Sequence, residues 1–264
     1  MAVKRPALGQ HFLRSEGILE RIADALPITP GRLVIEIGPG RGALTEKLLD
    51  RGAKIVAVEV DPGLAAGLEQ RFSGRLRVVA RDILKVELAE LVEAFGARPL
   101  VAGNLPYYIT SPIVRRVFGW NKEVEAAVFL VQKEVGERIT ARPGSSDYRF
   151  LSALCEYYSE AEYLFDVSPG AFQPPPRVQS GVVRLTMRPE VEEPQEFVKF
   201  LEAAFRQPRK TLTNNLGPTY GREKVAADPD ARKRAQELNV EQLHALWTRV
   251  GASSASATRV PNCV

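Results

Sequence analysis

The chain has 264 residues, of which 45% are hydrophobic and 26% charged, with a formal net charge of +4 and a sequence pI of about 9.1. This composition excludes a disordered or fibrous protein and predicts a substantial hydrophobic core. Only two cysteines, Cys155 and Cys263, are present, which excludes a disulfide framework. Without a long apolar run or a secretion signal, we expect a cytoplasmic protein with no membrane contact. The basic charge suits a polyanionic partner without requiring one.

Short runs rich in Val, Ile and Leu alternate with helical patterns through the first half of the chain. Residues 42–52 and 62–72 carry apolar side chains at helical spacing. The apolar runs predict buried strands at 33–38, 54–60, 76–82, 99–104 and 126–132. Strands that alternate with helices predict an α/β fold with a parallel, doubly wound sheet of the Rossmann type.

A change in composition follows a further predicted strand at 180–189. Residues 190–194, "EVEEP", are acidic and end in proline, which indicates a boundary between a domain at 1–190 and one at 191–264. Two helix faces follow, formed by Phe197, Val198, Leu201, Ala204 and Phe205, and by Leu243, Leu246, Trp247 and Val250. The second domain is therefore predicted to be small and all-helical, with an aperiodic tail after residue 250.

The loop "EIGPGRGALT" at 36–45 joins the first strand to the first helix. Gly38 and Gly40 permit a tight turn and close approach by a ligand. Glu59 lies twenty-one residues after Gly38, at the end of the second strand, where a carboxylate can accept hydrogen bonds from ribose hydroxyls. The pattern indicates a nucleoside-containing cofactor. It leaves NAD open, and also a glycine turn that merely packs a helix, whereas no GxxxxGK[ST] phosphate loop is present.

The third strand ends in Asp82, followed by Ile83. In a doubly wound sheet the ligand lies across the carboxyl ends of the strands, so Asp82 could accept a proton from an exocyclic amine, with Ile83 packed beside the ring. The alternative is an ordinary aspartate that caps a turn.

The fourth strand ends in "NLPYY", which falls at the same sheet edge. This turn suits methylation of an exocyclic amine, because the side-chain oxygen of Asn104 and the carbonyl of Leu105 can hold its N–H groups while positive charge develops. Pro106 makes the turn rigid, and Tyr107 offers a face on which a base can stack.

These motifs together resemble the ribosomal RNA adenine N6,N6-dimethyltransferases. The resemblance covers nearly the whole chain and includes "GQHFL" at 9–13, "EIGPGRGALT", "VEVD" at 58–61, "NLPYYITSPI", "VQKEVGERI" at 131–139 and "SPGAFQPPPRVQSGVVRL" at 168–185. It implies a class I methyltransferase domain that uses S-adenosylmethionine. It also implies, as substrate, two adjacent adenosines in the 3′-terminal hairpin loop of small-subunit (16S) ribosomal RNA, within an assembling 30S subunit. We expect a monomer.

By the same resemblance, several residues would contact the cofactor. His11 and Leu13 would touch it, Gly38 would lie under its methionine portion, and Glu59 would hold the ribose. Asp82 and Ile83 would hold the adenine, and Asn104 would contact both cofactor and target amine. Many relatives have an asparagine at the position of His11. With only two histidines in the chain and no metal-ligand spacing around them, we expect no metal.

Phe172 matches the family position whose ring packs on the target base, opposite Tyr107. A base that has left its stack must regain stacking, worth about 1 to 3 kcal/mol. The alternative is a core phenylalanine beside the proline run at 174–176.

Basic residues in four segments are candidate phosphate contacts: Lys4, Arg5, Arg115, Arg116, Arg138, Arg142, Arg206, Arg209 and Lys210. Two other functions remain open. One is a non-catalytic RNA-binding or ribosome-assembly factor on the same fold, which leaves the "NLPY" turn without a purpose. The other, less favoured, is an NAD-dependent oxidoreductase, although His11 precedes the first predicted strand and no other histidine precedes the helical domain.

Overall fold

The computed structural model describes residues 11–92, 97–192 and 195–251. The chain divides into two compact units, one formed by Met1–Thr140 and Tyr158–Val191, the other by Ala141–Tyr157 and Glu192–Val264. The chain passes between the units three times, and the third passage, after Val191, lies one residue beyond the boundary expected from the sequence. The grouping of 141–157 with the C-terminal helices has no counterpart in that expectation, which placed one continuous domain before residue 191.

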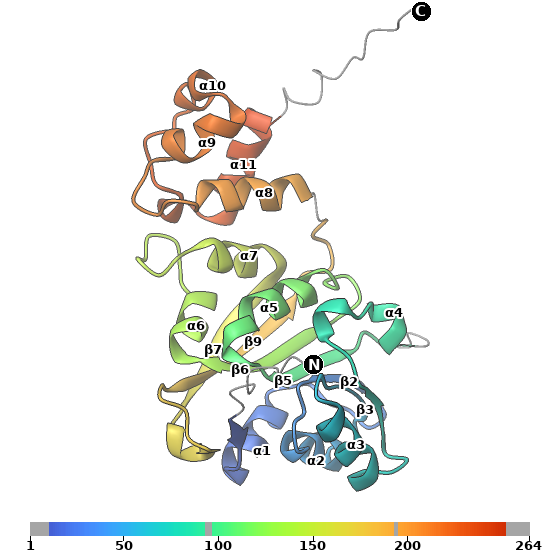
Figure 1. Cartoon of the computed structure of the whole chain (residues 1–264). Coiled ribbons are helices and arrows are strands. Elements are labelled where there is room, and N and C mark those ends of the chain that lie inside the picture. Colours follow the sequence, from blue (N-terminus) through green and yellow to red (C-terminus); the bar gives the residue numbers. More distant parts are fainter. Residues whose placement is uncertain (1–10, 93–96, 193–194, 252–264) are drawn as a thin grey trace, which may run out of the picture. The chain divides into compact units, whose positions relative to one another are not determined.

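The first unit is built on a seven-stranded sheet (Figure 1). In spatial order its strands are β4 (Leu76–Val79), β3 (Lys54–Val58), β2 (Leu33–Ile37), β5 (Leu100–Asn104), β6 (Ala126–Gln132), β9 (Ser180–Met187) and β7 (Ser159–Val167). The first five pair in parallel, as the alternation of strands and helices predicts. All six strands expected from the sequence are present, with ends shifted by a few residues.

The sheet is mixed, however, because β9 is antiparallel to both β6 and β7. β7 and β9 are connected by a loop that contains only the 3₁₀ turn η3 (Pro169–Ala171) and the short strand β8 (Phe172–Gln173). Without a crossover helix such a connection reverses the direction of the chain. The strand at β7 was not expected from the sequence.

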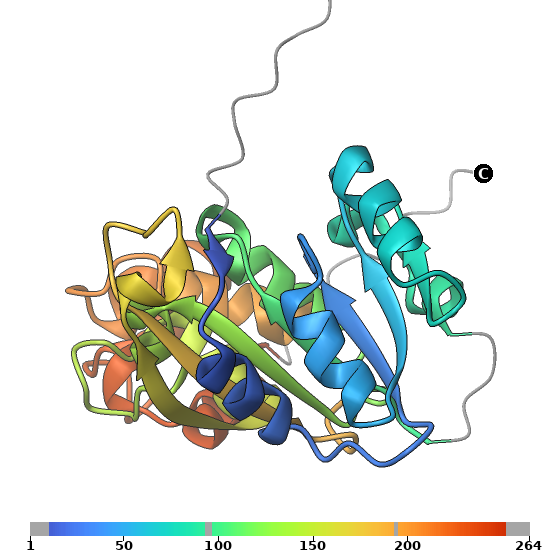
Figure 2. The same ribbon diagram turned by 90° about the horizontal axis from the view of Figure 1, so that it is seen from below.

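Helices cover both faces of this sheet. Figures 1 and 2 show α1 (Glu16–Asp24) and α2 (Ala43–Asp50) on one face and α5 (Thr110–Phe118) on the other. Alternate strand residues point to the first face, so Val34, Ala102 and Val128 share a core with Leu19 and Leu48. The remaining helices of the unit are α3 (Pro62–Arg71), α4 (Leu88–Leu91) and α6 (Lys133–Ile139), with 3₁₀ turns η1 (Ile83–Lys85) and η2 (Tyr107–Ile109).

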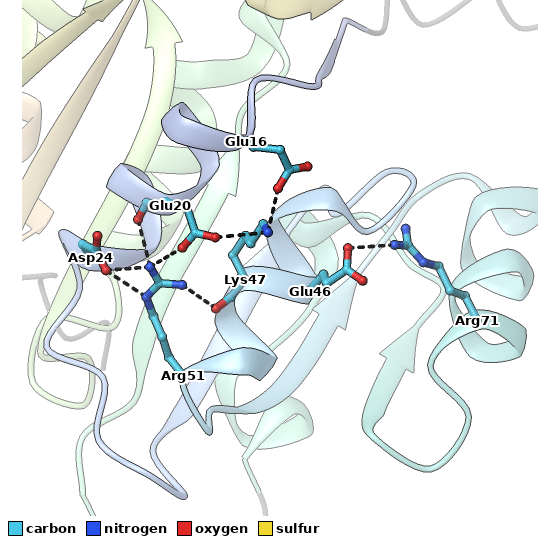
Figure 3. Close-up of polar contacts among 7 residues, drawn as sticks. All are labelled: Glu16, Glu20, Asp24, Glu46, Lys47, Arg51 and Arg71. Atoms are coloured by element: carbon cyan, nitrogen blue, oxygen red, sulfur yellow. Dashed lines mark hydrogen bonds and ion pairs between the residues drawn. The ribbon is translucent and has the colours of Figure 1, made fainter.

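Ion pairs tie α1 to α2 (Figure 3). Lys47 pairs with Glu16 at 2.6 Å and with Glu20 at 3.0 Å. Arg51 pairs with Glu20 and Asp24, both at 2.6 Å. The Arg51 and Lys47 cations hold the pKa of the Glu20 carboxyl below its ordinary value. A separate pair, Arg71 with Glu46 at 3.0 Å, connects α3 to α2. These ion pairs hold α1 in place. The helix begins three residues after the short strand β1 (Phe12–Leu13), so they also help to position that strand.

The second unit is helical. It contains α7 (Phe150–Tyr158), whose last residue, Tyr158, belongs to the first unit. Its other elements are α8 (Gln195–Ala204), α9 (Leu212–Tyr220), α10 (Arg222–Ala226), η4 (Ala235–Glu237) and α11 (Val240–Gly251). Its core is aromatic, because Phe197 of α8 packs against His244 and Trp247 of α11 with ring centroids 4.8 and 5.4 Å apart. The two helix faces expected from the sequence therefore pack together in α8 and α11. None of the helices in the described ranges is long and apolar enough to cross a membrane.

Candidate functional site

A cavity of about 260 Å³ opens at the carboxyl edge of the parallel strands in the first unit. It is lined by eight of the residues that the sequence predicts for the site: His11, Leu13, Gly38, Glu59, Asn104, Leu105, Pro106 and Tyr107. They come from the ends of β2, β3 and β5 and from the N-terminal strand β1 (Phe12–Leu13). The topology thus brings together residues that are up to 96 positions apart in the sequence, from His11 to Tyr107.

The side-chain carboxylate of Glu59 accepts hydrogen bonds from two backbone amides, one of them in the glycine loop. Gly38 and Gly40 adopt left-handed backbone angles, with φ of 67° and 59°. The amide of Gly40 donates to Oε2 of Glu59 at 3.1 Å, and the amide of Asp61 donates to Oε1 at 3.0 Å. Glu59 is 3% exposed and lines the cavity. Its carboxylate is therefore fixed in position, and its remaining lone pairs can accept hydrogen bonds from a ligand.

The "NLPY" turn places a fixed amide at the tip of β5. The side-chain nitrogen of Asn104 donates to the carbonyl of His11 at 3.1 Å. This contact fixes the orientation of the amide and leaves its oxygen as an acceptor in the cavity. The turn itself is anchored by the amide of Leu105, which donates to the Leu130 carbonyl at 3.0 Å, and by a bond of 3.1 Å from the Ile109 amide to the Pro106 carbonyl.

Tyr107 is half-buried, and both its hydroxyl and its ring have contacts that fix the side chain. Its hydroxyl shares a hydrogen bond of 2.6 Å with the hydroxyl of Ser180, and its ring stacks against that of His11 with centroids 6.1 Å apart. Burial raises the pKa of the Tyr107 phenol. The side chain thus remains neutral at physiological pH and presents a fixed aromatic surface to the cavity.

The strand β1 closes one side of the cavity. It pairs with β8, so Leu13 lies opposite Phe172. His11 adds a bond of 2.8 Å between its Nδ1 and the carbonyl of Pro174, and the amide of Arg14 donates to the Ala171 carbonyl at 2.8 Å. A side chain at Gly40 would lie 3.1 Å from the Phe12 ring. Glycine there allows the loop and β1 to lie close together.

Three predicted site residues are not among those that line this cavity. Asp82 follows β4, and its Oδ1 accepts a bond of 3.0 Å from the Leu84 amide, which is the turn-capping alternative considered from the sequence. Ile83 is 5% exposed. Phe172 is also 5% exposed, and its ring belongs to the hydrophobic core beneath β1. In this structure, therefore, Phe172 presents no free face to the cavity.

Glu36 is a cavity residue that the sequence did not single out. It is 1% exposed at the end of β2, and the hydroxyl of Thr45 donates to its Oε2 at 2.7 Å. Burial raises the pKa of this carboxyl to about 7, and the charge of Glu59 adds to the effect. A lone carboxylate inside the apolar run "LVIEIG" was the available signal. Other lining residues that were missed are Arg14, Arg41, Val60, Arg71 and Tyr108.

The predicted phosphate contacts of the first unit differ in their environments. Lys4 and Arg5 lie outside the described residues. Arg115 is exposed, and Arg138 is partly buried. Arg116 is partly buried as well: it donates to the carbonyl of Val86 and pairs with Glu87 at 2.8 Å. It therefore connects α5 to the end of η1.

In the second unit the four predicted contacts are all exposed: Arg142, Arg206, Arg209 and Lys210. Arg149 donates to the side chain of Gln236 at 2.9 Å. Among the described residues there is no group of three or more His, Cys, Asp or Glu side chains that could hold a metal ion.

The cavity has the features of a site for a nucleoside ligand. Two buried acidic side chains, Glu36 and Glu59, line it, and Val60 adds an apolar surface that is 41% exposed. The amide of Asn104 supplies an acceptor that cannot ionise. Such a set suits a ligand with hydroxyl and amine donors. Arg14, Arg41 and Arg71 line the same cavity, so the charge of its lining is mixed.

Comparisons with known proteins show to which family the chain belongs. A curated relative from Acidobacterium capsulatum, "Ribosomal RNA small subunit methyltransferase A", is 43% identical over 255 residues, covering 92% of this chain and 90% of its own. The protein of the same name from Pseudomonas aeruginosa is 41% identical over 247 residues, covering 89% of this chain and 90% of its own.

Solved structures have the same fold. The 23S rRNA methyltransferase ErmE matches with a TM-score of 0.68 and 28% identity, covering 91% of this chain and 99% of its own. A dimethyladenosine transferase from Plasmodium falciparum matches with a TM-score of 0.76 and 24% identity, covering 91% and 98%. A family model described as ribosomal RNA adenine dimethylase matches residues 1–250. The chain belongs to the ribosomal RNA adenine dimethylase family.

Proposed function

We propose that this chain transfers methyl groups from S-adenosylmethionine to the N6 amines of two adjacent adenosines in the 3′-terminal hairpin loop of small-subunit ribosomal RNA. The observation that carries the proposal is the amide of Asn104. Its nitrogen is tied to the His11 carbonyl, and the residue lines the cavity, so its oxygen would serve as an acceptor there. The names of relatives at 41–43% identity support the small-subunit RNA as substrate.

The cavity residues fit the cofactor. S-adenosylmethionine, when bound, supplies an electrophilic methyl group on a positively charged sulfur. Glu59, fixed by two backbone amides, would accept hydrogen bonds from its ribose hydroxyls. Gly38 lets the backbone lie close to the methionine portion, and Val60 offers apolar surface to the purine. The contact of Asp82 with the adenine amine stays a prediction from the family resemblance, because Asp82 does not line this cavity.

The "NLPY" turn would hold the target amine. The Asn104 side-chain oxygen and the Leu105 carbonyl accept its two N–H groups. As the nitrogen attacks and becomes tetrahedral, positive charge develops on it, and these dipoles stabilise that charge without reorganising. No strong base is required, because the amine loses its proton to solvent after attack has begun. Pro106 keeps the two acceptors in a fixed relation, and Tyr107 provides the stacking surface for the base.

The role that the family resemblance assigns to Phe172 remains a prediction. Its ring is buried in the core in this structure, so stacking on the base from that side requires the 171–174 segment to move. The exposed cations of the second unit, above all Arg209 and Lys210, would contact RNA phosphates. We further propose that the protein acts as a monomer on an assembling 30S subunit in the cytoplasm.

The proposal is tested by incubating the protein with undermethylated small subunits and labelled S-adenosylmethionine, followed by mapping of the modified nucleotides. Label in two neighbouring adenosines is expected. Asn104→Ala should lower the single-turnover rate at saturating cofactor about 100-fold, since one oriented acceptor is removed, with little change in the thermal unfolding midpoint. Subunit binding by the wild type without any methyl incorporation would instead identify a non-catalytic assembly factor.

A further inference from the structure

Two adjacent tyrosines follow Pro106, and the structure gives them different surroundings. Tyr107 is tied to Ser180 and packed against His11, as described above. Tyr108 lines the same cavity but is 66% exposed, more than any other large apolar side chain of the described ranges. Covering so exposed an aromatic ring with another apolar surface is favourable, because the ring is then removed from water. Tyr108 also lies at the mouth of a site proposed to receive an unstacked base.

Exposed residues also follow Tyr108 on α5. Ser111, Pro112 and Arg115 are all exposed. Ser111 and Arg115 are four positions apart within α5, which places them on one side of this helix, and Tyr108 belongs to the turn η2 directly before it. We call Tyr108, Ser111 and Arg115 the stripe: it contains an aromatic ring that lines the cavity, a hydroxyl and a guanidinium. Arg14, after β1, and Arg41, between β2 and α2, line the cavity and are exposed too.

This arrangement matches a single nucleic-acid strand better than a protein partner. A ring can stack on a base of any sequence, and cations placed along the path of the strand can contact its phosphates. Successive nucleotides of an unstacked strand are a few ångströms apart, so a base next to the one held by Asn104 lies within reach of the next residue along the turn. The stripe is also continuous with the cavity through Tyr108.

We propose that Tyr108 is the platform of a second nucleotide subsite, where the base adjacent to the target adenosine stacks while Arg115 contacts the phosphate on its outer side. The inference rests on the proposed function, because it requires an RNA strand in the cavity. It gives the second of the two neighbouring adenosines a defined place while the first is modified. The strand then needs to advance by one nucleotide between the two reactions.

The test compares Tyr108→Ala with Tyr108→Phe, which keeps the ring and removes only the hydroxyl. With undermethylated small subunits, Tyr108→Ala should lower kcat/KM about 10-fold or more, as expected when one base can no longer stack, whereas Tyr108→Phe should stay within about 2-fold of the wild type. Affinity for S-adenosylmethionine, measured by calorimetry, should be unchanged in both variants. Arg115→Gln should lower the slope of log K against log salt by about 0.7 to 0.9.

Several outcomes would overturn the inference. Equal kcat/KM in Tyr108→Ala and wild type would remove the subsite while leaving the proposed function intact. A parallel fall in cofactor affinity would show that the ring is part of the cofactor wall instead. Equal decreases in Tyr108→Phe and Tyr108→Ala would assign the effect to the hydroxyl. Absence of methyl transfer by the wild-type protein would reject the proposed function itself, and the subsite with it.

Discussion

Replacement of Glu36 by glutamine should make the stability of the folded chain less sensitive to pH. Burial raises the pKa of the Glu36 carboxyl from 4.5 to about 7. Between these two values the folded state binds a proton that the unfolded state has released. Stability therefore falls as pH rises through this window and levels off above about pH 7, because the raised pKa belongs to the folded state.

The size of the effect follows from the same values. A difference of about 2.5 pH units corresponds to about 3 kcal/mol, at roughly 1.36 kcal/mol for each unit, and most of it, about 2 to 3 kcal/mol, falls between about pH 5 and pH 8. Glu36 is 1% exposed, so screening by solvent is small. Glutamine has the same shape and can still accept the hydrogen bond from Thr45, but it does not ionise.

The assay is denaturant unfolding of both proteins at about pH 5 and pH 8. From the lower to the higher pH, the wild type should lose about 2 to 3 kcal/mol more unfolding free energy than Glu36→Gln. Thr45→Val is the matched control, because it removes the hydrogen bond that favours the ionised carboxyl. The unfolding free energy of this variant should fall more steeply with rising pH than that of the wild type. Equal decreases in wild type and Glu36→Gln would refute the assigned pKa and the burial argument behind it.

Further predictions concern the cofactor, the RNA and the helices. Glu59→Ala should weaken S-adenosylmethionine binding about 10-fold or more in calorimetry, since it removes hydrogen bonds to a charged group; unchanged affinity would exclude the ribose contact. Changing both Arg209 and Lys210 to alanine should reduce the salt slope of RNA binding by about 0.7 to 0.9 for each phosphate that these cations neutralise, and an unaltered slope would count against both. Arg51→Ala should cost about 1 to 2 kcal/mol of unfolding free energy because it breaks two ion pairs. Arg71→Ala breaks a single ion pair that is more exposed to solvent, and it should cost about 0.5 kcal/mol or less. Equal costs would contradict the stabilising role assigned to the ion pairs between α1 and α2.

The parallel part of the fold could be predicted because its pattern is local. β2 and β3 are short, largely buried apolar runs, and each is followed by a helix with its own period. β7 was missed since its sequence, "SEAEYLFDV", forms a partly exposed strand directly after α7 with no turn residue between them. The pairing of β1 with β8 could not be predicted either, because two residues carry no period and their partners are far away in the sequence.

The site could be predicted as far as strand ends determine it. Gly38, Glu59 and Asn104 all lie where parallel strands end, and ligands of doubly wound sheets bind there. The sequence could not show which side chains of the site already have hydrogen-bond or stacking partners in the folded chain. Tyr107 and Tyr108 are adjacent, and two distant contacts of Tyr107 distinguish the anchored ring from the exposed one: the hydroxyl of Ser180, 73 residues later, and the ring of His11. Phe172 is similar: its neighbours in sequence do not reveal which way the ring faces.

The pairing of β1 with β8 also sets the order in which the cofactor site is completed during translation. Phe12 pairs with Gln173, about 160 residues later, so a nascent chain that stops before this point has the glycine loop and Asn104 but an unpaired β1. Only after the 171–174 segment has left the ribosome exit tunnel can the wall of the cavity close. Acquisition of S-adenosylmethionine binding by a series of stalled nascent chains would therefore mark the pairing of β1 with β8.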